Sequence, residues 1–167
     1  YKYLKSLGIG FHFYNGVYLN ALQNPQVLNL SKKTIIYIPN VNSAESTKEK
    51  YMEVDHILSC IGNYEYTDEY GIYHIKTADD NELKIADLVN DTDYEQRDKI
   101  MGYLRNVQGP EDIDMIIALG MAKEGFDWPY CETTLTIGYR GSLTEIVQII
   151  GRCTRDSCNK EHAQFIN

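Results

Sequence analysis

Residues 133–155, "TTLTIGYRGSLTEIVQIIGRCTR", join two different patterns across a short polar turn. The first part, "TTLTIGY", is rich in β-branched residues, as is typical of a strand buried on both faces. Ser142 can accept a hydrogen bond from a free N–H group of a first helical turn, so we expect a helix to begin there. The apolar side chains that recur at helical spacing, and that we expect to face the core, are Leu143, Ile146, Val147 and Ile150.

The same alternation of strand and helix extends over most of the chain. Apolar, β-branched runs predict further strands at residues 33–40, 71–79, 113–120 and 163–167. Helical patterns lie between them, one beginning at Ser43 and ending before Gly62, the other beginning at Asp91 or Thr92 and ending near Asn106. Because strands that alternate with helices build parallel sheets, we predict an α/β fold with a doubly wound, mostly parallel sheet and helices on both faces.

The two ends of the chain indicate that it is part of a longer protein. Residues 1–30 mix aromatic, glycine and polar residues without a firm period, so we expect a mostly irregular approach segment with a short helix, leading from an upstream domain. Residues 31–167 are long enough for one domain with its own core. The chain starts without methionine and stops at "AQFIN", inside an expected strand. We therefore expect a fragment that is truncated at its C-terminal end.

Composition narrows the possible functions. The formal net charge of -8 argues against a domain that neutralises many phosphates alone, so any contact with nucleic acid must be local. Cys153 and Cys158 are close in sequence, but no second pair or well-placed histidine accompanies them. We therefore expect free thiols and no metal site. No apolar run is long enough to span a membrane and no signal pattern opens the chain, so we expect a cytoplasmic protein without a membrane partner.

Three loops are expected at the edge of the sheet where ligands usually bind. In doubly wound sheets this is the edge formed by the carboxyl ends of the strands. The loops are residues 39–46, "PNVNSAES", residues 120–129, "GMAKEGFDWP", and residues 139–142, "YRGS". The last of them leads into the helix that ends with "GRCTR".

These segments carry a resemblance to a known family. Residues 117–129, "IALGMAKEGFDWP", resemble motif V, and residues 148–155, "QIIGRCTR", resemble motif VI, of the second RecA-like domain in superfamily 2 helicases and related translocases. Residues 34–45, "TIIYIPNVNSAE", resemble motif IV, and the order of the motifs matches from about Lys33 to the end of the chain. A Q-x-x-G-R-x-x-R element downstream of G-F-D-x-P is more specific than either motif alone.

The resemblance implies that the chain is the C-terminal motor domain of an ATP-dependent DNA or RNA helicase or translocase. Arg152 and Arg155 would act as arginine fingers on ATP, and Gln148 would sense or position its phosphates. Guanidinium groups suit this task because they are planar, always charged and able to bond two oxygens at once. ATP and Mg²⁺ would be held mainly by a missing upstream RecA-like domain, because no G-x-x-x-x-G-K-[ST] phosphate loop occurs in this sequence. The fragment alone is therefore expected not to hydrolyse ATP.

The remaining roles follow from the same resemblance. Gly125 would let its loop turn closely, Gly151 would keep the backbone clear, and Asp127 would accept hydrogen bonds from the ribose or from an arginine of motif VI. Contacts to the nucleic-acid backbone need little net positive charge when amides and hydroxyls make them. The residues expected to make such contacts are Asn40, Asn42, Ser43 and Gly120.

The sequence also departs from the family pattern. Ile149 stands where many RNA-unwinding members carry arginine, and Leu119 stands where a threonine usually touches the strand backbone. These departures favour the DEAH-like and restriction-enzyme-like branch over the DEAD-box RNA group. The expected nucleic-acid partner is DNA or RNA, with DNA preferred. Two alternatives stay open: the motor subunit of a restriction system, and a catalytically silent RecA-like scaffold for docking of protein or nucleic acid.

Overall fold

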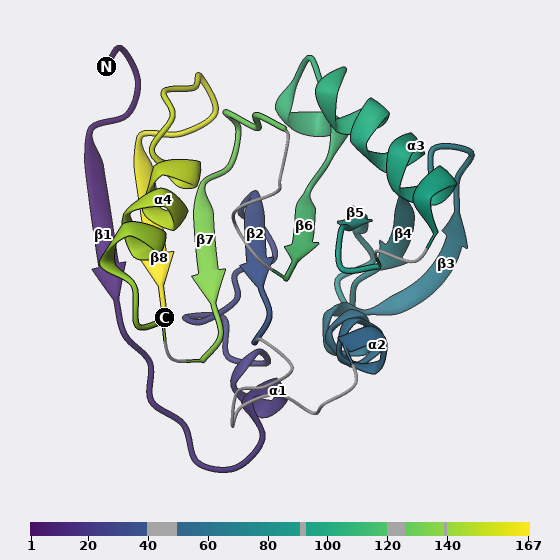
Figure 1. The fold of residues 1–167 in the computed structure, drawn as a ribbon, viewed down its shortest axis with the longest axis horizontal. Helices are drawn as coiled ribbons and strands as arrows, with labels where there is room; N and C mark the ends of the chain where they lie inside the picture. The colour runs from purple at the N-terminus through teal and green to yellow at the C-terminus, as the bar shows by residue number, and fades with distance from the viewer. Residues whose placement is uncertain (40–49, 91–92, 120–125, 139) are drawn as a thin grey trace.

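A computed structural model describes residues 1–39, 50–90, 93–119, 126–138 and 140–167. Strands of these residues form one eight-stranded sheet in the order β1-β8-β7-β2-β6-β5-β4-β3 (Figure 1). The strands are β1 (Ser6–Gly10), β2 (Thr34–Tyr37), β3 (Asn63–Thr67), β4 (Tyr73–Lys76), β5 (Glu82–Asp87), β6 (Met115–Ala118), β7 (Thr133–Thr136) and β8 (His162–Ile166). The helices are α1 (Tyr18–Ala21), α2 (Lys50–Ile61), α3 (Tyr94–Arg105) and α4 (Leu143–Cys153), with a 3-10 turn at Pro110–Asp112.

The sheet is parallel except at one end. All neighbouring pairs from β1 to β5 in the sheet order run parallel, including β2 with β6 and β2 with β7. Only β3, β4 and β5 pair with one another in antiparallel fashion within the described residues. The predicted mostly parallel α/β sheet is therefore confirmed.

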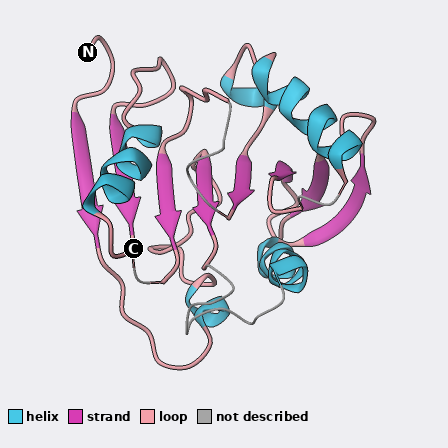
Figure 2. Ribbon diagram, viewed as in Figure 1, coloured by secondary structure: helices cyan, strands magenta, loops and turns pink. Residues whose placement is uncertain are grey.

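Helices cover both faces of the sheet, as predicted (Figure 2). Helices α3 and α4 pack on one face, where Ile35 and Tyr37 of the central strand β2 point. Helices α1 and α2 pack on the other face, together with Ile36 and with Ile38, which follows β2. The alternation follows from strand geometry, because successive side chains point to opposite sides. Since both faces are covered, every residue of β2 is buried.

Three strands lie where the sequence did not predict them. Strand β3, at one edge, has only exposed residues, so its side chains show no apolar pattern. Strand β5 pairs with β4 in a hairpin and lies beyond the strand predicted at residues 71–79. Strand β1 contains Gly8, where a Cβ atom would overlap the Gln164 side chain of the neighbouring strand. Residues 1–30 thus contribute an edge strand as well as the short helix α1.

The helix boundaries and the buried side of α4 differ in part from the predictions. Ser142 caps α4 as predicted, because its Oγ accepts a hydrogen bond from the Glu145 backbone N–H at 3.3 Å. Helix α3 is capped by Asp93, which differs from the predicted start, while Asp91 and Thr92 lie outside the described residues. The predicted start of α2 at Ser43 lies outside the described residues.

Of the four residues of α4 predicted to face the core, two do so and two do not. Ile149 and Cys153 are fully buried and Ile146 and Ile150 pack partly against the core. Leu143 and Val147, in contrast, are 75% and 59% exposed. The apolar residues of the helix extend around its circumference from Ile149 to Val147, a wider arc than the part that packs on the sheet, so the sequence alone cannot tell which part of this arc faces the core. The exposed arc remains available for contacts outside this domain.

Candidate functional site

Arg155 and Asp127 form an ion pair that joins two distant parts of the sequence. The Arg155 Nη1 atom lies 2.6 Å from Oδ1 of Asp127. Arg155 follows the end of α4, while Asp127 lies in the connection between β6 and β7. The two side chains are 56% and 59% exposed, so the pair is open to solvent and to other ligands. Residues that resemble motif V and motif VI therefore meet at the surface of the molecule.

Arg152 strengthens the same junction one turn earlier. Its Nη1 atom donates a hydrogen bond to the carbonyl oxygen of Phe126 at 2.9 Å. Its guanidinium group also lies over the Phe126 ring, 5.4 Å from the ring centre, in a cation–π arrangement. Phe126 and Trp128 are themselves 6% and 3% exposed and belong to the core under α3 and α4. The loop that carries Asp127 is thus anchored on both sides of the carboxylate.

The arginines do not lie at the edge that the loop positions suggested. Helix α4 begins beyond the carboxyl end of β7 and runs back along the sheet. Its last residue, Cys153, accepts a hydrogen bond from the hydroxyl of Thr134, at the amino-terminal end of β7, with 3.4 Å between Oγ1 and Sγ. Arg152 and Arg155 therefore sit on the helix layer near the opposite edge.

A buried lysine, which no sequence pattern predicted, holds this junction together. The Lys160 ammonium group donates hydrogen bonds to the carbonyl oxygens of Pro129 and Cys153 at 2.9 Å each, and to that of Cys131. Lys160 is only 4% exposed, and this burial lowers the pKa of its amine below the ordinary value. Because the Cys153 carbonyl belongs to the last turn of α4, the cation also suits the helix dipole. No pattern around Lys160 distinguishes it from a surface lysine.

Other residues expected in the site are placed as follows. Gln148 and Gly151 lie on the exposed side of α4. A Cβ atom at Gly151 would have no described neighbour within 4 Å. A need for glycine there would have to come from a partner outside the described structure. Five of the expected site residues lie outside the described ranges: Gly125, Asn40, Asn42, Ser43 and Gly120.

The strands that precede these loops are described, and their arrangement is informative. Strands β2 and β6 are parallel neighbours in which Tyr37 pairs with Ala118. The carboxyl ends of these two strands therefore lie side by side. Leu119, at the start of the second loop, packs partly buried against the core.

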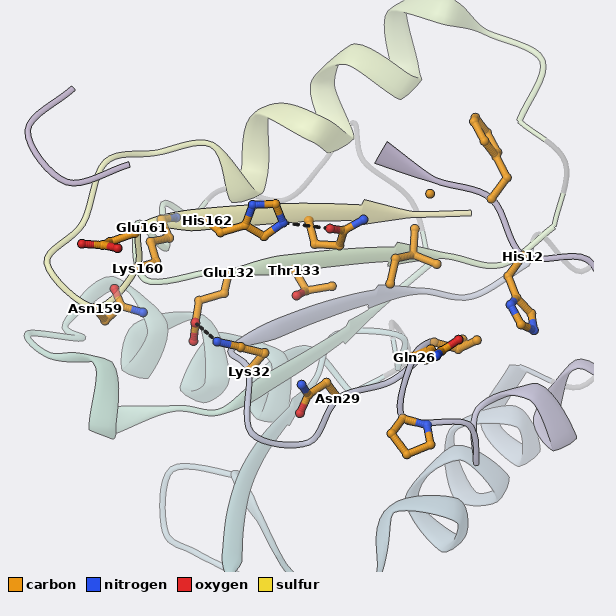
Figure 3. A pocket seen from close by; sticks show the side chains of 16 residues that line it. His12, Gln26, Asn29, Lys32, Glu132, Thr133, Asn159, Lys160, Glu161 and His162 are labelled. Carbon is orange, nitrogen blue, oxygen red and sulfur yellow. Dashed lines mark hydrogen bonds and ion pairs between the residues drawn. The ribbon is translucent and has the colours of Figure 1, made fainter. Parts of the chain in front are cut away.

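A separate hollow lies on the opposite face of β7 and β8 from α4 (Figure 3). It has a volume of about 740 Å³ and is lined mainly by polar side chains. Lys32 and Glu132 form an ion pair at 3.6 Å in it, and His162 Nε2 lies 2.9 Å from Oε1 of Gln164. The described residues that line it show no arrangement that indicates a particular ligand.

The described residues contain no group of three or more histidine, cysteine, aspartate or glutamate residues placed to hold a metal ion. Cys60, Cys131, Cys153 and Cys158 are free thiols. No helix in the described ranges combines the length and apolar character needed to cross a membrane.

The chain is similar to known proteins in sequence and in fold. The family model described as "Helicase conserved C-terminal domain" matches residues 25–157. A protein of Bacillus subtilis (strain 168), "Putative ATP-dependent helicase YeeB", is 62% identical over 169 residues, which cover 100% of this chain and 28% of that protein. A solved structure, "Mss116p DEAD-box helicase domain 2 bound to an RNA duplex", has a TM-score of 0.53 and 13% sequence identity, and the match covers 98% of this chain and 54% of that one. This likeness shows a shared fold.

Proposed function

The chain belongs to the helicase conserved C-terminal domain family, and we propose that it is the second motor domain of an ATP-dependent helicase or translocase. The chain spans 28% of the length of the curated relative that it matches. The proposed activity therefore belongs to the intact protein, in which an upstream RecA-like domain supplies the phosphate loop and holds ATP and Mg²⁺. This domain supplies the arginine side of the same site.

The observation that carries the proposal is the junction of Asp127 with Arg155 and of Phe126 with Arg152. Phosphoryl transfer needs fixed cations near the charge that develops on the γ-phosphate. Arg152 is fixed by a carbonyl and an aromatic ring, while the partner of Arg155 among the described residues is an exposed carboxylate. An exposed ion pair contributes about 1 kcal/mol or less to stability, so Arg155 can exchange Asp127 for phosphate at little cost.

The exposed side of α4 supports a facing domain. Leu143 and Val147 are large apolar residues that solvent reaches, on the same side of the helix as Gln148 and Gly151. Apolar side chains next to candidate nucleotide contacts are typical of an interface that closes over a ligand. In this proposal Gln148 positions the phosphates, Gly151 leaves room for the facing domain, and Asp127 with Gly125 borders the nucleotide.

Nucleic acid is proposed to bind at the carboxyl ends of β2 and β6, through Asn40, Asn42, Ser43 and Gly120. The ends of the two strands that precede these residues are neighbours in the sheet, and neutral amides and hydroxyls suit an acidic domain. We propose DNA as the track. Two departures from the RNA-unwinding pattern support this: Leu119 packs against the core, and Ile149 of α4 is 0% exposed. The same departures support placement near the restriction-enzyme-like branch.

The test is ATP hydrolysis by the full-length protein, measured without nucleic acid and with single-stranded DNA, double-stranded DNA or RNA. The proposal expects hydrolysis that nucleic acid stimulates, with DNA more effective than RNA. Stronger stimulation by RNA would reject the DNA preference alone. Absence of hydrolysis under all conditions would instead support a catalytically silent scaffold.

A further inference from the structure

Arg140 connects two elements that carry different parts of the proposed function. It lies between β7 and α4, and its side chain is only 10% exposed. Its Nη1 atom bonds Oε1 of Glu145, in the first turn of α4, at 3.0 Å. Its Nη2 atom donates to the carbonyl oxygen of Ile38, which follows β2, at 3.1 Å. One guanidinium group therefore bridges the central strand and the helix of the arginine fingers.

Ile38 is the point from which the proposed nucleic-acid loop departs. Its own N–H donates to the carbonyl of Ala118 at 2.9 Å, at the end of β6. The preceding carbonyl, of Tyr37, accepts from Ile137 N–H at 3.0 Å, at the end of β7. The ends of β2, β6 and β7 are thus tied together here, immediately before Pro39 and Asn40. A displacement of the loop after β2 would first be felt at the Ile38 carbonyl.

Glu145 links Arg140 to helix α4. It lies in the first turn of α4, and its backbone N–H is held by Ser142. Helix α4 runs from Leu143 to Cys153, so Arg152 lies in its last turn. A helix of this length is a stiff rod of roughly 15 Å, because each residue adds about 1.5 Å. A shift or tilt of its first turn must therefore move its last turn as well.

We propose that Arg140 is a positioning residue that couples occupancy of the nucleic-acid loop after β2 to the placement of Arg152 and Arg155 at the ATP site. The proposal rests on the proposed function. Nucleic acid bound at residues 40–43 fixes the backbone at Ile38, Arg140 passes that position to Glu145, and α4 brings its arginines to the phosphates. Arg140 itself touches neither ATP nor nucleic acid in this mechanism.

The chemistry of the side chain explains why arginine is required. Its planar group presents several N–H donors in fixed directions, so it can bond a carbonyl and a carboxylate at once and hold their relative position. A lysine at this place keeps the charge but offers a flexible point donor on a different stem. Arg140→Lys should therefore preserve the charge and lose most of the coupling.

The experiment uses the full-length protein and measures three quantities: basal kcat for ATP, kcat at saturating single-stranded DNA, and the Kd for that DNA. Arg140→Gln and Arg140→Lys are expected to lower the ratio of stimulated to basal kcat by about tenfold, within the range usual for coupled sites. The Kd for DNA should stay within about threefold of the wild-type value. Arg105→Gln, at the end of α3, controls for loss of a positive charge.

A second variant separates coupling from a general loss of structure. Glu145→Gln leaves the contact to Ile38 but weakens the contact to the helix, and it should lower the same ratio. Glu95→Gln removes a carboxylate from the first turn of α3, and should leave the ratio unchanged. A wild-type ratio in Arg140→Gln, or in Glu145→Gln if the arginine variants fail to fold, would overturn the inference and leave the proposed function intact. A wild-type protein without stimulation would reject the proposed function and the inference with it.

Discussion

The Arg155 guanidinium lies 2.6 Å from the Asp127 carboxylate, between the end of α4 and the connection that follows β6. Asp127 therefore holds the proposed finger in place while the site is open. Asp127→Asn should lower the kcat of the full-length protein, but less than Arg155→Ala does. In the Arg155→Ala background, Asp127→Asn should have a smaller effect than in wild type, because the group that it positions is gone. Independent, additive losses in this double-mutant cycle would contradict the positioning role.

The same pair should contribute little to the stability of the fold. Both side chains are more than half exposed, and exposed ion pairs contribute about 1 kcal/mol or less. Urea unfolding of the 167-residue chain should therefore give nearly the same free energy for wild type and Arg155→Gln. A loss of several kcal/mol would show that the pair has a structural task and would weaken its assignment to catalysis.

Lys160 should be far more important for stability than its place in the sequence suggests. It donates to three buried or partly buried carbonyls, and hydrogen bonds to charged groups contribute roughly 1.5–3 kcal/mol each. Lys160→Met keeps the volume and leaves these carbonyls without their donor, but it also removes a buried charge that is costly to desolvate, so we expect a net loss of about 2–4 kcal/mol. Lys99→Met, at an exposed position of α3, is the control in the same urea titration. Equal stability of the two variants would show that the carbonyls find other partners.

The two sides of α4 should respond in opposite ways to truncation. Ile149 is 0% exposed, and removing a buried isoleucine side chain beyond Cβ costs about 2–5 kcal/mol. Val147 is 59% exposed, so Val147→Ala should change the unfolding free energy by about 0.5 kcal/mol or less. Urea unfolding of both variants of the 167-residue chain measures the difference. If Val147→Ala proved as costly as Ile149→Ala, the orientation of α4 described above would be wrong.

His74 should make stability depend on pH near neutrality. Its ring nitrogens lie 2.8 Å from Asp68 and 2.6 Å from Glu82, and its ring stacks on Tyr66 with 4.2 Å between centres. Burial alone lowers the pKa of His74, but the hydrogen bonds to Asp68 and Glu82 outweigh it and raise the pKa. The folded state then binds the proton more tightly than the unfolded chain. This stabilisation is fully present below about pH 6.5 and is lost as the pH rises through the raised pKa.

Comparison of urea unfolding at about pH 6 and about pH 9 tests this prediction. Wild type should lose more stability between these values than His74→Gln does. His56→Gln, at an exposed position of α2, should keep the wild-type dependence. The Asp68 carboxyl does not reverse the sign in this window. Burial raises its pKa, but bonds to His74 and to the backbone of Ile72 and Tyr70 lower it below the usual range, so it titrates at more acidic pH. An identical pH dependence in wild type and His74→Gln would contradict the raised pKa of His74.

The sequence could predict the elements whose burial is encoded in their own residues. Strand β2 is buried on both faces and reads as a continuous apolar run, and Ser142 has the chemistry of a helix cap. The exposed edge strand β3 has no such signal, because its pairing with β4 is made by the backbone. The inward side of α4 could not be chosen, because Leu143 and Val147 are as apolar as the residues that the sheet covers.

The candidate site was predictable to the extent that it lies in motifs. Gln148, Arg152, Arg155 and Asp127 follow from spacing and resemblance, and the structure describes where their side chains lie. Lys160 and Arg140 were missed because each binds backbone carbonyls that lie far away in the sequence, those of Pro129 and Cys131 for Lys160 and that of Ile38 for Arg140. Every residue has a backbone carbonyl, so the sequence does not show which carbonyl a lysine or arginine binds. That contact becomes visible in the folded structure.

The central claim is that Arg155 completes an ATP site in the intact protein, and the most direct test is the kcat of full-length Arg155→Ala at saturating ATP and nucleic acid. The account predicts a loss of about 10³-fold or more, since arginine fingers contribute that much to phosphoryl transfer. Arg105→Ala, an exposed arginine at the end of α3, should retain wild-type turnover. Turnover of Arg155→Ala close to that of wild type, in a protein that remains folded, would contradict the account.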